Sequence, residues 1–303
     1  MLYRPTLAVS NPVQVCGSTN NARRLRLVLP ETTLAPRAAG EIGAILSMRE
    51  VGKRFGGVRA VDGCGFDIAR GTITGLIGPN GAGKTTLFNI IAGFIQPDAG
   101  QVLLDGADVT GFAPHLLFRR GLVRTFQIPH EFERLTVLDN LMLVPSDRSG
   151  ENILASWFRW RRVCAEERRI REKADEVLEF LQLTRVRDEF AGNLSGGQKK
   201  LLELGRTMMT DARLVLLDEP GAGVNPTLMA RLVADIRRLN IERGYTFCII
   251  EHDMDLIAAL CDPVVVMAEG KVLTQGSIAD VRADPRVIEA YFGGSGAPQE
   301  AGE

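Results

Sequence analysis

The chain has 303 residues, 45% hydrophobic and 24% charged, which is the composition of a folded globular protein rather than of a disordered or fibrous one. Its net charge of −1 excludes a general electrostatic attraction to nucleic acid or to anionic lipid. Five scattered cysteines without a Cys-x-x-Cys pair argue against a disulfide framework or a zinc site. No stretch reaches the ~18 uninterrupted apolar residues that a membrane helix needs, so any membrane role is expected to be peripheral.

Residues 1–43 differ from the rest of the chain. They are rich in Pro, Asn, Thr, Ala and Arg, and they show no sustained period. We expect a disordered extension or a wrongly assigned start codon, with a transit peptide as the alternative. The tail at 294–303 is expected to be flexible, which leaves 44–293 as the folded domain.

Strand-like and helix-like segments follow one another from residue 44. Residues 44–51 and 58–68 have strand character around a turn at 53–57, and the apolar run 71–78 precedes a helical pattern at 84–94. Further along, 213–220 and 245–253 are unbroken apolar runs, as strands buried on both faces of a parallel sheet should be. Residues 263–276 predict a hairpin that turns at Glu269-Gly270.

A helical block interrupts this strand pattern between about 130 and 194. Within residues 165–183 the apolar positions follow helical spacing, namely Ile170, Ala174, Val177, Leu178 and Leu181. The sequence therefore predicts a helical subdomain inserted into an α/β sheet protein.

The segment after the run 71–78 matches the phosphate-binding pattern GxxxxGK[ST]. Glycines there let backbone N–H groups converge on phosphate oxygens, and the following helix adds its positive dipole end. Lys84 is expected to reach the β- and γ-phosphates of a nucleotide, and the Thr85 hydroxyl to bind Mg²⁺. The predicted nucleotide-binding residues are Gly78, Pro79, Asn80, Gly81, Ala82, Gly83, Lys84, Thr85 and Thr86.

Polar side chains at the ends of the other predicted strands suggest the rest of a catalytic site. Asp218 ends an apolar run where a Mg²⁺ carboxylate belongs, and Glu219 follows it as a candidate base for the attacking water. His252 also ends a strand and is a candidate donor to the γ-phosphate. Gln127 is a candidate contact to Mg²⁺ or to the attacking water. Phe55 is a candidate adenine-stacking ring, with a core phenylalanine as the alternative.

A second glycine-rich stretch, LSGGQ, comprises Leu194, Ser195, Gly196, Gly197 and Gln198 and precedes a good helix pattern. Small residues at a helix N-terminus form an anion site by the same logic as the first loop. Because the helical block separates this stretch from Lys84, we expect it to contact the γ-phosphate bound to a different subunit. Two chains would then be needed to close one site.

With these residues in order, the chain resembles the ATP-binding subunits of ABC transporters from about residue 45 to 292. GPNGAGKTT is similar to the Walker A motif, LVLLDEP to Walker B and LSGGQ to the ABC signature, while Gln127 and His252 match the Q-loop glutamine and the switch histidine. The resemblance implies an α/β fold of the ABC-type P-loop NTPases, with a mixed sheet core, an antiparallel β region and an inserted α-helical subdomain. It also implies ATP and Mg²⁺ as ligands, and two ATPase subunits that enclose two ATP molecules.

A finer resemblance is to the ATPases of branched-chain amino-acid importers. GLVRTFQIP, LTVLDNL, GAGVNP and the tail DVRADPRVIEAYFGG carry it, and importers of urea or other small polar solutes share much of it. Two residues depart from the family pattern, since Asn225 replaces an aspartate and Phe55 replaces a tyrosine. The first departure puts a charged role for that loop in doubt.

The resemblance implies partners and a location. We expect a second ATPase subunit, identical or homologous, two membrane-spanning permease subunits and, indirectly, a solute-binding protein, on the cytoplasmic face of the membrane and without nucleic acid. The stretch SWFRWRR at 156–162, with Trp157 and Trp160, predicts an amphipathic helix or a contact with permease or lipid.

Two alternative functions stay open. A soluble ABC ATPase acting on ribosomes or DNA usually carries two cassettes or a long coiled-coil insert, and this chain shows neither. The ATPase of a lipid or lipopolysaccharide exporter has similar motifs but not this tail. A P-loop kinase or GTPase is excluded by the ordered signature and switch residues.

Overall fold

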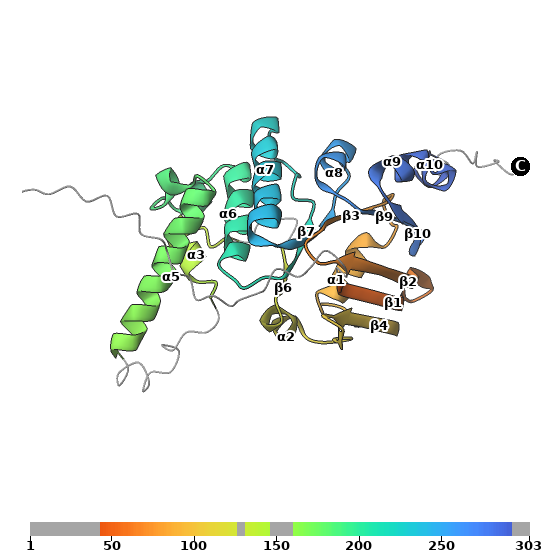
Figure 1. The fold of residues 1–303 in the computed structure, drawn as a ribbon, viewed down its shortest axis with the longest axis horizontal. Helices are drawn as coiled ribbons and strands as arrows, with labels where there is room; N and C mark the ends of the chain where they lie inside the picture. Colours follow the sequence, from red (N-terminus) through yellow and green to blue (C-terminus); the bar gives the residue numbers. More distant parts are fainter. Residues whose placement is uncertain (1–42, 126–130, 146–159, 293–303) are drawn as a thin grey trace, which may run out of the picture. The chain divides into compact units, whose positions relative to one another are not determined.

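The computed structural model describes residues 43–125, 131–145 and 160–292, whose strands form two sheets. The antiparallel sheet has the order β2-β1-β4-β5 (Figure 1). It contains β1 (Ala44–Phe55), β2 (Val58–Ala69), β4 (Ala99–Leu104) and β5 (Ala107–Asp108).

The β1–β2 hairpin is tighter than the sequence predicted. Strand β1 continues to Phe55, which pairs with Val58, so the turn is Gly56-Gly57 rather than 53–57. A two-residue turn of this kind needs positive φ, and Gly56 has φ 58°. The predicted turn began too early because Arg54 and Phe55 are both exposed at the hairpin tip, which removes the alternation expected of a strand.

The second sheet has the order β10-β9-β3-β8-β7-β6, with parallel pairing except between β9 and β10. Its strands are β3 (Ile73–Ile77), β6 (Leu122–Arg124), β7 (Leu214–Asp218), β8 (Thr246–Ile250), β9 (Val264–Ala268) and β10 (Lys271–Gly276). The predicted hairpin at 263–276 is confirmed as β9–β10, and its turn residues Glu269 and Gly270 both have positive φ.

Helices account for most of the remaining described residues. They are α1 (Lys84–Ile91), α2 (Pro114–Arg119), α3 (Val137–Met142), α5 (Trp160–Phe180), α6 (Gly196–Met208), α7 (Pro226–Arg243), α8 (Met254–Leu260), α9 (Ile278–Ala283) and α10 (Pro285–Phe292), with short 3₁₀ turns at Thr184–Val186 and Ala191–Asn193. Helix α1 ends three residues before the predicted boundary, because Gly93 adopts a left-handed conformation with φ 76°. None of the helices in the described ranges is long and apolar enough to cross a membrane.

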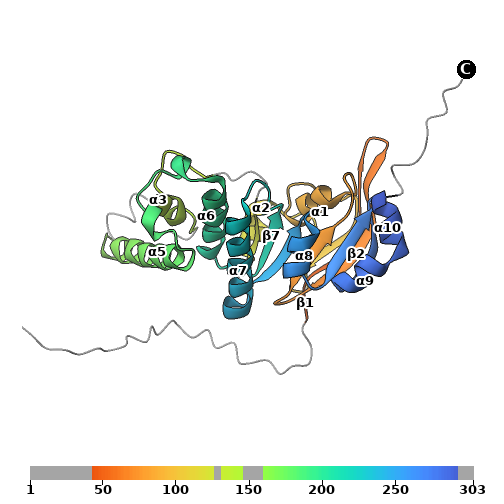
Figure 2. The same cartoon turned by 90° about the horizontal axis from the view of Figure 1, so that it is seen from above.

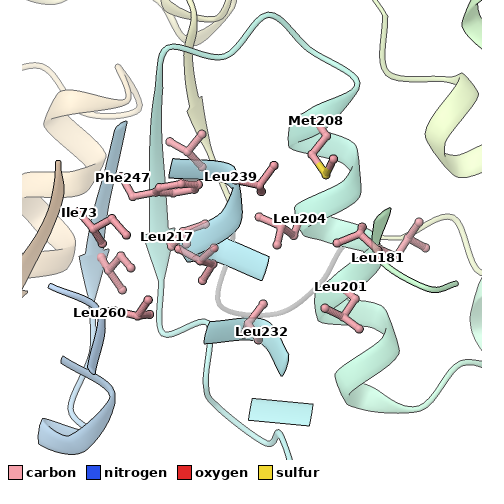
Figure 3. Close-up of a cluster of buried hydrophobic side chains, with 14 of the residues drawn as sticks. Ile73, Leu181, Leu201, Leu204, Met208, Leu217, Leu232, Leu239, Phe247 and Leu260 are labelled. Carbon is pink, nitrogen blue, oxygen red and sulfur yellow. The ribbon is translucent and has the colours of Figure 1, made fainter. Parts of the chain in front are cut away.

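The six-stranded sheet lies between two hydrophobic cores. Alternate residues of β7 face opposite sides, so Val215 and Leu217 pack in one core while Leu214 and Leu216 pack in the other. We call the first the helix-side core, because residues of α5, α6, α7 and α8 complete it. Figure 3 shows part of this core, with labelled residues of α6, α7 and α8. The second, the sheet-side core, joins the six-stranded sheet to α1 and the antiparallel sheet. Burial on both faces explains the unbroken apolar runs of the sequence.

The predicted helix at 165–183 corresponds to α5, which begins earlier, at Trp160, and ends earlier, at Phe180, so that Leu181 follows the helix. Four of its predicted core positions, Ala174, Val177, Leu178 and Leu181, are at most 4% exposed, and Ile170 packs against the same core. Its helical period is therefore explained by packing into the helix-side core.

Candidate functional site

The first glycine-rich loop joins β3 to α1 and is enclosed by neighbouring backbone. A Cβ atom on Gly78 would lie 2.1 Å from the Met267 carbonyl oxygen, and one on Gly83 would lie 2.2 Å from that of Ala60. Gly83 also has φ 97° and is the N-cap of α1 without a side-chain cap. The fold therefore requires glycine at both positions and leaves the first amides of α1 without a side-chain acceptor.

Lys84 is the buried cation of this loop. It is 6% exposed, and its Nζ donates to the carbonyl oxygens of Gly78 at 2.7 Å and Pro79 at 2.9 Å. Burial lowers the pKa of Lys84, while the carboxylates of Glu219 and Asp218 oppose that decrease. The loop is thus folded over an ammonium group in a position to attract an anion.

Asp218 ends β7 next to this loop and is 6% exposed. Its Oδ2 accepts from Nη2 of Arg124, the last residue of β6, at 2.9 Å, and both side chains are 8% exposed. Arg124 also donates to the Asn89 side chain on α1. A buried carboxylate needs such a partner, and here an arginine supplies it.

Glu219 and His252 meet at the ends of β7 and β8. Glu219 Oε1 lies 2.7 Å from His252 Nε2, and the Glu219 backbone N–H donates to the Ile250 carbonyl at 2.9 Å. Glu219 has φ 48°, an uncommon conformation for a residue other than glycine, which turns the chain away from the sheet. Two residues that the sequence singled out separately are therefore in direct contact.

The LSGGQ stretch forms the N-terminus of α6. Ser195 is the N-cap in a capping box with Gln198, whose Oε1 accepts from the Ser195 N–H at 2.9 Å. Ser195 and Gly196 are exposed, whereas a Cβ on Gly197 would meet Leu228 Cδ1 of α7 at 2.3 Å. In both views α6 lies on the side of α7 away from α1 (Figures 1 and 2). The structure thus brings Lys84, Asp218, Glu219 and His252 together and places the signature stretch elsewhere.

The other predicted site residues lie at the edge of this group or outside the described chain. Phe55 is 49% exposed at the tip of the β1–β2 hairpin, with Lys53 Nζ 5.7 Å from its ring centre, so it is not a core phenylalanine. Leu194 is buried. Asn225 caps α7 by accepting from the Leu228 N–H at 2.9 Å. Gln127 and Trp157 lie outside the described residues, as does the side chain of Trp160.

The predicted magnesium ligands have suitable chemistry. The Thr85 hydroxyl and the Asp218 carboxylate offer the oxygen donors that Mg²⁺ prefers, and Mg²⁺ is usually held together with substrate phosphates. No group of three or more His, Cys, Asp or Glu side chains that would hold a metal occurs in the part of the chain described. The residues therefore fit an ion that arrives with a nucleotide.

Sequence reasoning missed three residues at this site. Arg124 on β6 forms an ion pair with Asp218 on β7, and no local sequence pattern predicts a pair between residues so far apart in the chain. Burial raises the pKa of Tyr291 on α10, and a hydrogen bond with the Gly78 backbone partly offsets that increase. Glu251, which precedes His252, had a visible signal, because a carboxylate at the end of a buried strand is the criterion that identified Asp218.

This site defines the chain as a P-loop nucleotide-binding protein. It combines a buried strand, a glycine-rich loop around a lysine, a helix N-terminus and a carboxylate on a neighbouring strand. A family model described as ABC transporter matches residues 61–222, and one described as branched-chain amino acid ATP-binding cassette transporter matches residues 271–297. The chain belongs to the ABC transporter family, as the sequence motifs predicted.

Individual relatives agree over nearly their whole length. A probable branched-chain amino acid transport ATP-binding protein LivG of Archaeoglobus fulgidus is 42% identical over 259 residues, covering 85% of this chain and 99% of the relative. The high-affinity branched-chain amino acid transport ATP-binding protein BraF of Pseudomonas aeruginosa is 40% identical, covering 82% and 98%.

Solved structures confirm the predicted fold class. A nucleotide-free ATP-binding cassette from an ABC transporter matches with a TM-score of 0.72 at 37% identity, covering 82% of this chain and 99% of that one. The ADP conformation of an ATP-binding cassette of an ABC transporter matches with a TM-score of 0.72 at 38% identity, covering 83% and 99%.

Proposed function

We propose that the chain is the ATP-hydrolysing, energy-coupling subunit of a membrane importer for branched-chain amino acids or a related small polar solute. The observation that carries the chemistry is the contact of 2.7 Å between Glu219 and His252, at the sheet edge where Asp218 and Lys84 also lie. The solute is inferred from the names of the relatives and from the family match at 271–297.

In this proposal Lys84 and the amides of the loop Gly78–Thr86 bind the ATP phosphates, and Phe55 stacks on the adenine. Phosphate oxygens replace the carbonyl oxygens of Gly78 and Pro79 as acceptors for the Lys84 ammonium. Thr85, Asp218 and Gln127 would hold Mg²⁺, which, when bound, offsets negative charge on the phosphates.

Glu219 accepts a proton from the water that attacks the γ-phosphorus, and the bond to the β-phosphate oxygen breaks to give ADP and phosphate. The Nε2–H of His252 is directed at the Glu219 carboxylate in the structure described. Because Nε2 carries only one hydrogen, the imidazole must turn from this contact before it can serve the γ-phosphate. His252 then donates to a γ-phosphate oxygen. Ser195 to Gln198 of a second subunit complete the site, which is consistent with the exposure of Ser195 and Gly196.

The partners in this proposal are a second ATPase subunit, identical or homologous, two permease subunits and, indirectly, a solute-binding protein. The chain would then lie on the cytoplasmic face of the membrane. An ATPase acting on ribosomes or DNA, or one serving a lipid exporter, is the alternative, and the family match at 271–297 favours the importer.

Glu219→Gln tests the chemistry. The variant should bind ATP but turn over at least ~100-fold more slowly, as expected for the loss of a general base. It should also accumulate as an ATP-bound dimer in size-exclusion chromatography. Glu289→Gln on α10, the same chemical change at an exposed position, is the matched control and should keep the wild-type rate. Normal hydrolysis by Glu219→Gln would refute the assignment.

Purification of the tagged chain from native membranes in mild detergent, followed by mass spectrometry, tests the transport role. Two polytopic permeases and a second ATPase in the complex would support the importer. Recovery with ribosomal or DNA-repair proteins alone would refute transport and leave the ATPase chemistry intact.

A further inference from the structure

The sheet ladder between β7 and β8 ends at the site of Glu219. The last pair in register is Asp218 with Ile250, and one more backbone hydrogen bond follows, from the Glu219 N–H to the Ile250 carbonyl. The left-handed conformation of Glu219 then turns the chain, so the next segment, Gly221–Asn225, leaves the sheet. A backbone donor beyond this point needs a partner that the ladder no longer supplies.

Glu251 supplies that partner. Its side chain is buried, its Oε1 accepts from the Gly221 N–H at 2.7 Å, and its Oε2 accepts from the His252 N–H at 3.1 Å. The approach depends on glycine, since a Cβ on Gly221 would lie 2.8 Å from that same Oε1. One buried carboxylate therefore joins the segment after β7 to the segment after β8.

These two segments carry the groups assigned to hydrolysis. The Gly221 N–H is two residues from Glu219, and the other amide bound by Glu251 belongs to His252 itself. Hydrogen bonds from a backbone N–H to a carboxylate are stronger than neutral ones. The bond from Gly221, at 2.7 Å, is a short one of this kind, and the bond from His252, at 3.1 Å, is longer. The Glu251 carboxylate thus restricts both ends of the 2.7 Å contact between Glu219 and His252.

We propose that Glu251 is a positioning residue for ATP hydrolysis, which sets the separation of Glu219 and His252 by holding the two segments together. The proposal rests on the roles assigned above to Glu219 and His252. Glu251 itself does not touch the reacting atoms in this proposal, because both of its oxygens accept from backbone amides.

Steady-state kinetics of full-length variants tests this role. Glu251→Ala should lower kcat at least ~10-fold while the KM for ATP changes less than about twofold, because geometry at the reacting atoms is lost and the phosphate loop is intact. Glu251→Gln should have a smaller effect, because its amide oxygen still accepts from Gly221 while its NH₂ group faces the His252 N–H. Asp255→Asn is the control, since Asp255 is exposed on α8 and its bond to Asp253 is made by its backbone N–H, which the substitution keeps.

A second readout keeps the proposal testable if Glu251→Ala does not fold. Amide hydrogen exchange of the peptide covering 219–225 should be modestly faster in Glu251→Gln than in the wild type, because a neutral amide oxygen holds the Gly221 N–H less strongly than a carboxylate does. The kcat should fall with it. Combined with His252→Ala, Glu251→Gln should add less than about twofold to the loss in rate, because residues that act through one another are not additive. A folded Glu251→Gln with wild-type kcat, or a fully additive double variant, would overturn the proposal.

Glu219→Gln, measured alongside, separates this inference from the proposed function. If it hydrolyses ATP normally, the role of Glu219 is wrong and the present inference falls with it. If Glu219→Gln is inactive while both Glu251 variants are normal, only the positioning role is refuted.

Discussion

The loop Gly78–Lys84 and the stretch Ser195–Gln198 both bring small residues to the N-terminus of a helix, but their surroundings differ. In the first, the backbone of Met267 and Ala60 fills the space where side chains would be, and a buried lysine lies inside. In the second, Ser195 satisfies the helix end through its own capping box, and Gly196 faces outward. The first is a cradle formed within one chain, whereas the second is exposed at Ser195 and Gly196, as the proposed contact with a second subunit requires.

The largest effect should come from removing the cation of the cradle. Lys84→Ala is expected to weaken ATP binding at least ~100-fold, because a charge-assisted contact to phosphate is lost from a buried site. Titration with a fluorescent ATP analogue measures it. Lys173→Ala on α5 removes an ammonium group from the helical part of the chain and should leave the affinity unchanged. An unaltered Kd for Lys84→Ala would contradict the interpretation of this loop.

Gly83→Ala tests how closely the cradle is packed. The added methyl would lie 2.2 Å from the Ala60 carbonyl at a φ of 97°, so the free energy of unfolding should fall by about 2–4 kcal/mol. Urea denaturation gives this value. A loss below 1 kcal/mol would mean that the loop relaxes freely, and that its glycines are not required by the fold.

Gly196→Ala is the same change on the exposed segment. The nearest atom to the added methyl is the Gly223 carbonyl oxygen at 3.7 Å, so the stability should change by less than about 1 kcal/mol. The rate of ATP hydrolysis should nevertheless fall at least ~10-fold, because the methyl lies where the phosphate of the other subunit is expected. A wild-type rate would argue against the cross-subunit contact.

The smallest overall effect is expected at two serines that have the same local role as helix N-caps. Ser195 and Ser277 both cap helices in capping boxes, on α6 and α9 respectively. Each Ser→Ala change should cost about 1 kcal/mol in thermal or urea denaturation. Only Ser195→Ala should also slow ATP hydrolysis. Equal rates of ATP hydrolysis for the two variants would mean that Ser195 acts only as a helix cap.

The sequence predicted the parts of this site that depend on local spacing. The phosphate loop follows from a pattern of eight adjacent residues, and Asp218, Glu219 and His252 follow from their position after apolar runs. Parallel pairing then brings these strand ends to one edge, which makes the contact between Glu219 and His252 a consequence of the fold. The helical period of α5 was equally visible, because only one of its faces is buried.

What the sequence did not predict depends on tertiary contacts or on very short elements. Strands β5 and β6 have two and three residues, too few for any period to be recognised. The ion pair of Arg124 with Asp218 joins residues 94 positions apart. The bonds of Lys84 to the carbonyl oxygens of Gly78 and Pro79 depend on the path of the loop backbone, which a motif of residue types does not describe.

Strand β3 connects the phosphate loop directly to both hydrophobic cores of the folded domain. Its Ile77 packs in the helix-side core and its Leu76 in the sheet-side core, and the loop begins at the next residue. Neither core can melt without displacing this strand, so heat should unfold both in one cooperative transition. A nucleotide bound at the loop would therefore raise the melting temperature of both cores together, including α5 and the hairpin β1–β2, which lie on opposite sides of the sheet.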